Sequence, residues 1–528
     1  MASNELSIVE YLYDSGTIKH ACGYCEKKSS YKRDEEKTEI ILGMWAESLT
    51  VDNYQSLIDR GWRRSGRYCY IPRNIETCCP MYTIRCNALD FVVSKSQKII
   101  IKRMTKFLKD GERMIEEESR TKKKSDKDEL HGIGACSNAE LPEEEFAEYS
   151  ARAHKNILQN EPMMLATNCE KRLSQCPEDV IKSKIKRESS QDHDSPPSHP
   201  MVPSKLSQPT EIPPNRDGMP RKKKLMRIER ARSRLLAQGK TLEEIEDFYR
   251  KKKMPTGAKS IEELLSTVED GQNKLEIKLI RVSSEEFYNT FDESFKLFKK
   301  YQEAVHHDKP EDQTKKSFSN FLGPSRLIHR SVRRGPPMGY GPFHQQYRLN
   351  GKLIAVGVID ILPYCVSSVY LFYDPEYSFL SLGTFSSLIE VRLVRELYKS
   401  ASDLKYYYMG YYIHEIPKMR YKAKMTPSFL LCPETYTWHP IAKCTPKLDR
   451  QKYSRLNEDV YALDEDGEMS AEDIRQVRVL YRGESLKLYG EVQKIRHLKG
   501  ERDDVEKVKL YAKLVGKTCA KSMSLILT

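Results

Sequence analysis

Apolar and polar positions alternate most regularly in the second half of the chain. Leu353–Ile361 and Val366–Tyr373 are runs of β-branched and aromatic residues separated by Pro363, and they predict two strands joined by a turn. Asp374 precedes a proline, and such a residue is pushed out of helical geometry, so the second strand should end there. We expect the rest of the chain to be arranged around these two strands.

The period of the apolar positions then changes to that of a helix. Residues 384–398 have one apolar face, made of Phe385, Leu388, Ile389, Leu393 and Leu397. Leu382 and Gly383 precede this face. A glycine turn that feeds a helix leaves backbone N–H groups free for a phosphate or a developing oxyanion, although an ordinary strand-to-helix turn reads the same way. A third strand is predicted at Tyr406–Ile413.

Composition divides the chain into regions. The hydrophobic fraction is 39% and the mean hydropathy is −0.66, which is low for a fully compact chain and indicates solvated linker. The predicted regions are a Cys-rich domain at 15–104, a disordered linker at 105–220, a basic helical segment at 221–253, a second linker at 254–274, a main α/β domain at 275–440, and a C-terminal extension at 441–528 with a closing helix at Val505–Leu525.

The charge balance favours a polyanionic partner. Lys and Arg number 89 against 76 Asp and Glu, a net charge of +13. The basic segment concentrates this charge in Lys222, Lys223, Lys224 and Arg227. A cationic helix of this kind can neutralise RNA phosphates without reading sequence, but it also fits a nuclear localisation patch or a solvated face.

Cysteines provide the candidate metal ligands. No apolar run approaches the ~20 residues that span a bilayer, and the start of the chain has no secretory signal pattern. We therefore expect a reducing location, in which the 13 cysteines are thiols or metal ligands. Cys22 and Cys25 form a Cys-x-x-Cys pair, and Cys78 and Cys79 are adjacent; together they can surround one metal ion or cluster, or they are buried inert thiols.

Long and unusual strings place the chain beside a known family. Residues 359–383 read IDILPYCVSSVYLFYDPEYSFLSLG and residues 406–422 read YYYMGYYIHEIPKMRYK. Both resemble the C-terminal half of eukaryotic arginyl-tRNA–protein transferase. The resemblance continues, in the expected order, at residues 22–25, 59–66, 77–80, 339–347 and 430–436.

The resemblance implies a fold and an activity. The fold is of the α/β (α+β) class, with an acetyltransferase-like catalytic domain whose strands part to hold the acceptor end, and a small Cys-rich N-terminal domain joined to it by a disordered and basic linker. The activity is transfer of arginine from arginyl-tRNA to the α-amino group of proteins that begin with Asp, Glu or oxidised Cys, which marks them for ubiquitin-dependent degradation in the N-degron pathway.

The resemblance also implies a cofactor and a location. It associates Cys22, Cys25, Cys78 and Cys79 with zinc or an iron–sulfur cluster, and it implies neither coenzyme A nor nicotinamide. We expect a monomer in the cytoplasm and nucleus, with no membrane partner. Two alternatives stay open: an acyl-CoA-dependent acyltransferase of similar fold, and a metal-stabilised adaptor that binds RNA or reads degrons without transfer.

Aminoacyl transfer requires alignment, help with a proton and an oxyanion donor, because the ester is already activated. An α-amino group has a pKa of about 7.7–8.0, so no covalent nucleophile is needed. Cys365 and Cys432 are therefore expected to be core thiols. Asp360 lies within an apolar strand and is either a proton acceptor or half of a buried ion pair. The other candidate catalytic residues are His344, His414, Ser367 and Ser368.

Binding candidates follow from the substrates that the resemblance implies. An acidic first residue demands a nearby cation, and Lys418 and Arg420 follow the third strand, with Arg348 and Lys422 as reserves. Tyr411 belongs to a tyrosine run that is either core or stacked on the terminal adenine. The remaining candidates are Gln345, Gln346, Leu382 and Gly383 for substrate, and Arg63 and Arg64 for RNA, in a run at 60–67 that also fits a solvated turn.

Overall fold

The computed structural model describes residues 6–11, 18–22, 24, 38–111, 235, 236, 238, 241, 259–266 and 271–528. The described residues up to 111 and from 260 onward belong to one compact unit, which contains two β-sheets. The expectations for Cys25, Lys222, Lys223, Lys224 and Arg227 lie outside the described residues, as do those for nearly all of the linker at 105–220 and the segment at 221–253.

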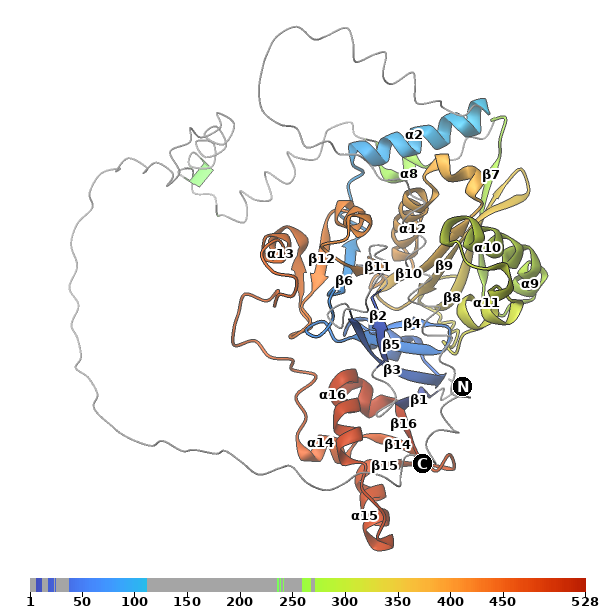
Figure 1. Ribbon diagram of the computed structural model, residues 1–528. Helices are drawn as coiled ribbons and strands as arrows, with labels where there is room; N and C mark the ends of the chain where they lie inside the picture. The colour runs from blue at the N-terminus through green and yellow to red at the C-terminus, as the bar shows by residue number, and fades with distance from the viewer. Residues whose placement is uncertain are drawn as a thin grey trace, which may run out of the picture. The chain divides into compact units, whose positions relative to one another are not determined.

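The strands predicted from the pattern lie in an eight-stranded sheet with the order β13-β12-β6-β11-β10-β9-β8-β7 (Figure 1). Among the described strands of this sheet, β10 and β11 form the one parallel pair. Its strands are β6 (Tyr82–Asn87), β7 (Leu275–Arg281), β8 (Gly341–Leu349), β9 (Lys352–Ile361), β10 (Cys365–Tyr373), β11 (Tyr406–Tyr412), β12 (Ser428–Leu431) and β13 (Trp438–Pro440).

Helices cover both faces of this sheet. On β10, Tyr370 and Phe372 contact Phe298 of α10, whereas Leu371 lies beside Gly383 of α12. Neighbouring side chains of a strand point to opposite faces, so α10 and α12 lie on opposite sides. The helices packed around the sheet are α2 (Lys95–Asp110), α8 (Ile261–Leu264), α9 (Glu285–Asn289), α10 (Phe291–His306), α11 (Lys315–Leu322), α12 (Leu382–Tyr398) and α13 (Ile441–Leu448).

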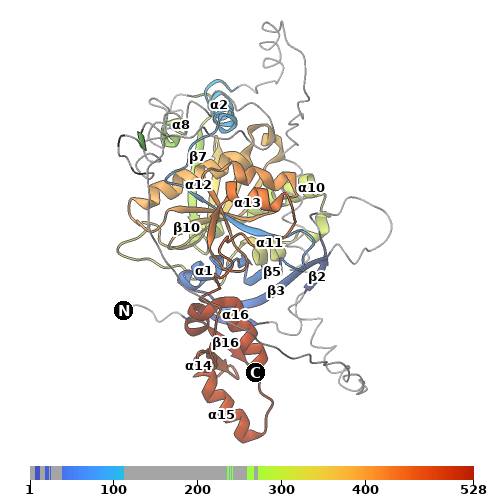
Figure 2. The same cartoon turned by 90° about the vertical axis from the view of Figure 1, so that its left-hand side faces the viewer.

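A second eight-stranded sheet joins the two ends of the chain. Its order is β15-β14-β16-β1-β3-β5-β4, with β2 paired to β3, and β1 lies between β16 and β3. Figures 1 and 2 show the blue N-terminal strands beside the red C-terminal elements. The strands are β1 (Ile8–Tyr11), β2 (Ile18–Ala21), β3 (Thr38–Ser48), β4 (Arg63–Ser65), β5 (Tyr68–Pro72), β14 (Arg478–Tyr481), β15 (Ser485–Leu488) and β16 (Ser524–Leu527). Its helices are α1 (Val51–Ile58), α14 (Ala471–Arg475), α15 (Tyr489–Lys499) and α16 (Val505–Ser522).

The sheets cut across the regions expected from composition. β6 comes from the region expected as a separate Cys-rich domain at 15–104, yet it pairs with β11 and β12 of the other sheet. Strands from the expected extension at 441–528 complete the N-terminal sheet. The closing helix ends at Ser522 and gives way to β16, because residues 524–527 pair with β1 and β14. Helix α2 also continues into the first residues of the expected linker.

The four elements predicted from periodicity are confirmed. β9, β10, α12 and β11 begin and end within two residues of the predicted bounds. The mixed α/β class is confirmed as well, in the form of two mixed sheets. Among the described helices, none is long and apolar enough to cross a membrane.

Candidate active site

Strands β10 and β11 run side by side for a short distance and then separate. They pair at only three positions, the last being Ser367 with Tyr408. Beyond this point a bulge follows on each strand, and β10 continues along β9 while β11 continues along β6. We call this region the β10–β11 parting. Crevices at the carboxyl ends of parallel strands, where neighbouring strands turn to different partners, are the usual ligand sites of α/β sheets.

A buried carboxyl group lies at the closed end of the β10–β11 parting. Glu390 of α12 is 1% exposed and accepts hydrogen bonds from the hydroxyls of Tyr407 on β11 and Ser368 on β10. Burial raises the pKa of Glu390 to about 7, and the two hydroxyl groups only partly offset this. Its Oε2 atom has no hydrogen-bond partner in the described part of the chain. Sequence reasoning missed this residue.

Gly357 of β9 makes room for this carboxyl group. A Cβ atom at this position would lie 3.4 Å from Glu390 Oε1 and 3.8 Å from Gln345 Cβ. Gln345 itself is buried and accepts a hydrogen bond of 2.7 Å from the hydroxyl of Tyr347. Gln345 therefore lies in the polar cluster around Glu390, on the sheet face that α12 covers.

Buried positive charge lies beside the part of β11 that follows its separation from β10, which we call the β11 arm of the parting. Lys422 lies in η4 (Pro417–Lys424), is 6% exposed, and donates from Nζ to the Tyr411 carbonyl at 2.6 Å. Burial and the nearby Arg63 guanidinium lower the pKa of Lys422 to about 7. Arg63 donates to the Gly410 carbonyl, and its Nε has no partner among the described residues. Among the described residues, Lys422 also forms no ion pair with a carboxylate.

The turn before α12 differs from the expectation. Gly383 lies inside the helix, whose first residue is the buried Leu382, and the left-handed turn residue is Ser381 with φ of 54°. Arg103 of α2 donates to the Phe379 carbonyl and the Ser381 hydroxyl at 2.9 and 3.1 Å. A serine held by an arginine thus makes the turn, and the glycine is not needed for it.

Asp360 forms a buried ion pair. It is 0% exposed, and Arg64 of β4 donates to both of its carboxylate oxygens, with Nε at 2.9 Å from Oδ2. Burial lowers and the Asp360 carboxylate raises the pKa of Arg64, with a net increase. Because Arg64 belongs to the N-terminal sheet and Asp360 to β9, the pair joins the two sheets. Of the two roles left open for Asp360, the geometry supports the ion pair.

The predicted histidines lie in different environments. His344 is buried with Nε2 at 2.8 Å from the Leu322 carbonyl, and burial lowers its pKa to about 4. A histidine that stays neutral at pH 7 and is held by a backbone carbonyl fits a structural role. His414 is partly exposed, with Nδ1 at 2.8 Å from the Tyr412 hydroxyl and Nε2 at 2.8 Å from Asp449. His414 lies between β11 and η4, beyond the parting.

The two serines on β10 differ in exposure. Ser367 is 1% exposed and lies at the last position that pairs with β11. Ser368 is half-buried and donates to Glu390. Ser368 therefore connects the buried carboxyl group to the β10–β11 parting.

Other predicted binding residues are occupied by protein contacts. Gln346 donates to the Thr290 hydroxyl at 2.9 Å, and the exposed Arg420 donates from Nε to the His414 carbonyl at 3.0 Å. Arg348 forms an ion pair with Glu293 at 2.6 Å. Lys418 lies in η4, and its side chain is outside the described part.

The two arginines expected to bind RNA, Arg63 and Arg64, are buried and have protein acceptors. Arg63 and Arg64 are each 6% exposed and donate to backbone carbonyls and to Asp360, so they do not form a phosphate-gripping surface. Nearby, Tyr411 donates to the Gly61 carbonyl at 2.7 Å, and Trp62 donates to the Leu514 carbonyl at 3.1 Å. The run at 60–67 fastens parts of the fold together instead of forming a solvated turn or a nucleic-acid surface.

The N-terminal cysteines converge as expected. The sulfur atoms of Cys22, Cys78 and Cys79 all lie within 4.8 Å of one another, and Cys22 and Cys79 are buried. The Tyr24 amide points at the Cys22 sulfur at 3.4 Å. Three thiols this close, one of them accepting a backbone N–H, fit a soft metal ion or cluster. Neither Cys69 nor Cys86 belongs to the cluster, and burial raises the pKa of each to about 12.

The thiols of the main sheet remain poor nucleophile candidates. Burial raises the pKa of Cys365 well above the ordinary value of a thiol. Cys432 is also buried, but hydrogen bonds from the Thr435 side chain and from nearby backbone N–H groups outweigh burial and lower its pKa. No histidine or lysine acts on either thiol among the groups that shift their pKa values.

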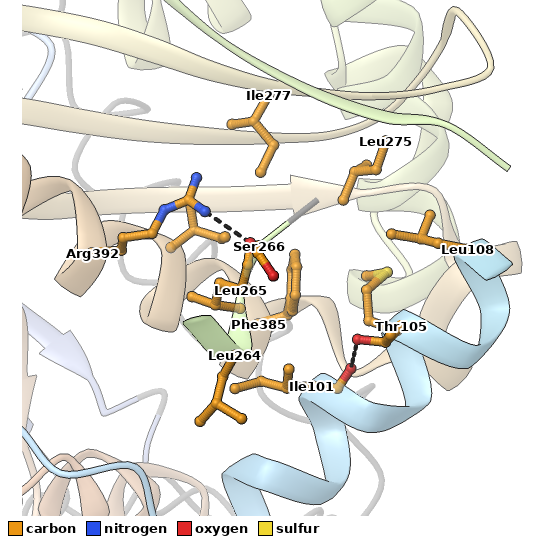
Figure 3. A pocket seen from close by; sticks show the side chains of 12 residues that line it. Ile101, Thr105, Leu108, Leu264, Leu265, Ser266, Leu275, Ile277, Phe385 and Arg392 are labelled. Atoms are coloured by element: carbon orange, nitrogen blue, oxygen red, sulfur yellow. Dashed lines mark hydrogen bonds between the residues drawn. The ribbon is translucent and has the colours of Figure 1, made fainter. Parts of the chain in front are cut away.

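An apolar cavity of about 160 Å³ lies apart from the parting, between α2, α8, α12 and β7. Leu108, Leu275 and Phe385 are among the side chains that line it (Figure 3). Its polar groups are satisfied locally, since Arg392 donates to the Leu265 carbonyl and Thr105 to the Ile101 carbonyl. Because its lining is mostly apolar and it lies apart from the parting, this cavity is not the candidate active site.

Comparisons with known proteins match the same family in both halves of the chain. A family model described as "Arginine-tRNA-protein transferase, N terminus" matches residues 20–99, and its C-terminus counterpart matches residues 293–432. The chain is 40% identical to arginyl-tRNA–protein transferase 1 of Drosophila melanogaster over 98% of this chain and 99% of the relative. It is 34% identical to the Arabidopsis thaliana protein of that name, over 86% of this chain and 76% of the relative.

A bacterial protein matches a shorter part. The aspartate/glutamate leucyltransferase of Campylobacter jejuni is 37% identical over 18% of this chain and 37% of the relative.

Asp360→Asn should destabilise the protein by about 3–5 kcal/mol, because it leaves the Arg64 charge buried without a partner. Urea unfolding measures this change. Glu47→Gln is the control: it breaks the exposed ion pair with Arg67 and should cost less than about 1 kcal/mol. Equal stability of the two variants would contradict the assigned role of the Arg64–Asp360 pair.

Proposed function

The chain belongs to the arginyl-tRNA–protein transferase family, and from this we infer that it transfers arginine from arginyl-tRNA to the α-amino group of proteins. The observation that carries this conclusion is 40% identity over 98% of this chain and 99% of a relative with that name. It favours aminoacyl transfer over the acyl-CoA and adaptor alternatives. We propose that the products enter the N-degron pathway of ubiquitin-dependent degradation.

We place the reaction in the β10–β11 parting. The amine nitrogen attacks the ester carbonyl, the bond to the ribose oxygen breaks, and that oxygen receives a proton as the tRNA leaves. Alignment of the two reactants supplies about 7–11 kcal/mol in reactions of this kind. The bulge in β10 takes Val369 out of the pairing with β9, and we assign the oxyanion contact to the backbone at this bulge.

The parting also supports an acetyltransferase-like fold for the catalytic half. The parallel pair of β10 and β11, joined by α12, and the bulge at the point of separation are the features that favour it. The acceptor end of arginyl-tRNA would enter between the two strands where they separate. We retain the basic segment at 221–253 as a tRNA contact, a monomeric state, and a cytoplasmic and nuclear location as proposals.

We propose that Lys422 reads the acidic first residue of the acceptor protein. Among the described residues, the buried Lys422 ammonium group donates to a backbone carbonyl and pairs with no carboxylate; its burial is costly, and a carboxylate would offset this cost. Acceptors beginning with Asp, Glu or oxidised Cys supply such a group. The name of the Campylobacter jejuni relative supports an acidic acceptor. Lys418 and Arg420, in the same η4 segment, remain candidates for the rim of this site.

We propose that Cys22, Cys78 and Cys79 hold zinc or an iron–sulfur cluster, with Cys25 as the fourth ligand. When bound, such a group supplies a crosslink between the two cysteine pairs. The residues around it belong to a small core that contains Met81, Tyr411 and Met419. Because Tyr411 and Met419 belong to β11 and η4, the metal would stabilise the β11 arm of the parting.

Transfer of radiolabelled arginine tests the function. The purified chain, given arginyl-tRNA and peptides that differ only in their first residue, should label peptides with Asp or Glu first and leave a peptide with Gly first unlabelled. Absence of label on every peptide would overturn the proposed function. Label that depended on acetyl-CoA in place of arginyl-tRNA would replace it with the acyl-CoA alternative.

Lys422→Met should raise the Kd for an N-acetylated peptide with Asp first by about 10–100-fold, because a hydrogen bond to a charged group contributes about 1.5–3 kcal/mol. The acetyl group removes the titration of the α-amine. In the unsubstituted protein this affinity should fall as pH rises above 7, since Lys422 then loses its proton. Lys424→Met, at an exposed position of η4, is the control. Equal effects of both substitutions would exclude Lys422 as the reader.

Cys78→Ser should abolish stoichiometric metal, measured by elemental analysis of protein purified without oxygen. Cys69→Ser, at a buried thiol outside the cluster, should retain the metal. The same metal content in both variants would contradict the proposed site.

A further inference from the structure

Glu390 is a buried titratable group that has no role in aligning the amine with the ester. It projects from α12 against the sheet face that includes Gly357 of β9, Ser368 of β10 and Tyr407 of β11. Ser368 and Tyr407 lie at the closed end of the β10–β11 parting, where the pairing of the two strands ends. A carboxyl group in such a place is costly when ionised, so its presence requires an explanation.

The hydrogen bonds around Glu390 leave it free to change its charge. The Tyr407 and Ser368 hydroxyls are the hydrogen-bond donors that act on the carboxyl group, and its Oε2 atom has no partner in the described part of the chain. None of the groups that shift its titration is a cation. Ionised Glu390 therefore lacks the buried counter-charge that fixes Asp360, and a proton can occupy the open oxygen.

The titratable and charged groups that face this cluster come from several elements. The Tyr407 hydroxyl of β11 donates a hydrogen bond to Glu390, and the negative charge of Glu390 raises the pKa of Tyr347 on β8. Arg392 of α12 acts on Tyr347, and Tyr421 of η4 acts on Tyr407. The tyrosines lie far from their own titration range at neutral pH, since burial raises the pKa values of Tyr347 and Tyr407 well above their ordinary value. Glu390 is thus the group of this cluster that can exchange a proton near pH 7.

A short route connects Glu390 with the parting. Ser368 bonds to Glu390 and is half-buried, whereas its neighbour Ser367 is fully buried. Ser368 also immediately follows the last position at which β10 pairs with β11. A hydroxyl group both donates and accepts, so Ser368 can receive a proton from one side while it gives its own to the other.

We propose that Glu390 is the final proton acceptor of arginine transfer. It is a positioning residue that lies behind the reacting atoms and acts on them through the Ser368 hydroxyl. This inference rests on the proposed function. As the N–C bond forms, the amine nitrogen gives a proton to Ser368 Oγ, and Ser368 gives its own proton to Glu390. When the C–O bond of the ester breaks, the same relay returns a proton to the leaving ribose oxygen.

The acidity of Glu390 fits this task. Its pKa of about 7 leaves it ionised in the range in which an α-amino group, with a pKa of about 7.7–8.0, begins to be neutral. A proton acceptor works best with a pKa near the operating pH. The relay should therefore be open above pH 7 and closed below it, where Glu390 holds its proton.

A structural role makes the opposite prediction. Glutamine has the same shape as glutamate and accepts the same two hydroxyl bonds, so a structural Glu390 tolerates Glu390→Gln.

Because folding raises the pKa of Glu390, the folded protein loses stability as pH rises from about 4.5 to about 7. Glu390→Gln removes this loss, so its Tm should match that of the unsubstituted protein at pH 4.5 and exceed it at pH 8.

The test compares single-turnover arginine transfer at saturating arginyl-tRNA and Asp peptide between pH 5.5 and 9. In Glu390→Gln the rate should fall about 100-fold or more at pH 8. The inflection near pH 7 should disappear, while the Kd values for arginyl-tRNA and for the N-acetylated Asp peptide stay unchanged. Glu396→Gln, at an exposed position of the same helix, should keep the rate and the inflection.

Ser368→Ala provides a second variant that does not alter the carboxyl group. It should also lose the inflection near pH 7, because the route from the amine to Glu390 is interrupted. A wild-type rate with the inflection intact in Glu390→Gln, or an inflection retained in Ser368→Ala, would overturn the relay. Failure of the unsubstituted protein to transfer arginine would overturn the proposed function instead, so the two failures are distinguishable.

Discussion

The bidentate ion pair between Arg64 and Asp360 holds together the two sheets on which the candidate site depends. Both side chains are buried, so loss of either one would leave the charge of the other buried without compensation. The pair lies behind the strands that part, because Asp360 of β9 is the direct neighbour of Ser367 on β10. Further bonds from the same N-terminal segment reach β11: Tyr408 donates to Asp59, and Tyr411 donates to the Gly61 carbonyl. The N-terminal sheet thus fixes where β10 and β11 end their pairing.

This arrangement explains why the chain interleaves its ends instead of forming separate domains. β11 can leave β10 only if another strand accepts its backbone groups, and β6 from the N-terminal region does so. β10 meets the same requirement through β9. Removing the N-terminal region would therefore take away a strand of the catalytic sheet, not an accessory domain. The parting is a product of both halves of the chain.

Local pattern predicted β9, β10, α12 and β11, since strand and helix periods are properties of short stretches. It did not predict that β6 joins them, because strand pairing across more than 300 residues leaves no local signal. The partner of Asp360 lies 296 residues away, so the sequence left two roles open. The run at 60–67 has the composition of a nucleic-acid contact, but Arg60, Arg63 and Arg64 are buried and have protein acceptors instead. Glu390 did leave a signal that was overlooked: it is an acidic residue between Ile389 and Val391 in the apolar part of a helix.

The two titratable groups around the parting share one physical logic. Burial raises the pKa of the Glu390 acid to about 7 and lowers the pKa of the Lys422 base to about 7, so each group can change its charge near pH 7. In the proposed site, an acidic acceptor would bring a carboxylate, which favours charged Lys422, and an amine that must lose a proton to Glu390. Both buried groups are thus completed by the substrate's own charges. A neutral acceptor supplies no carboxylate, so the cost of burying the Lys422 charge is not offset when it binds. The same burial that makes each group costly in the free protein therefore favours an acceptor that carries both an acid and an amine.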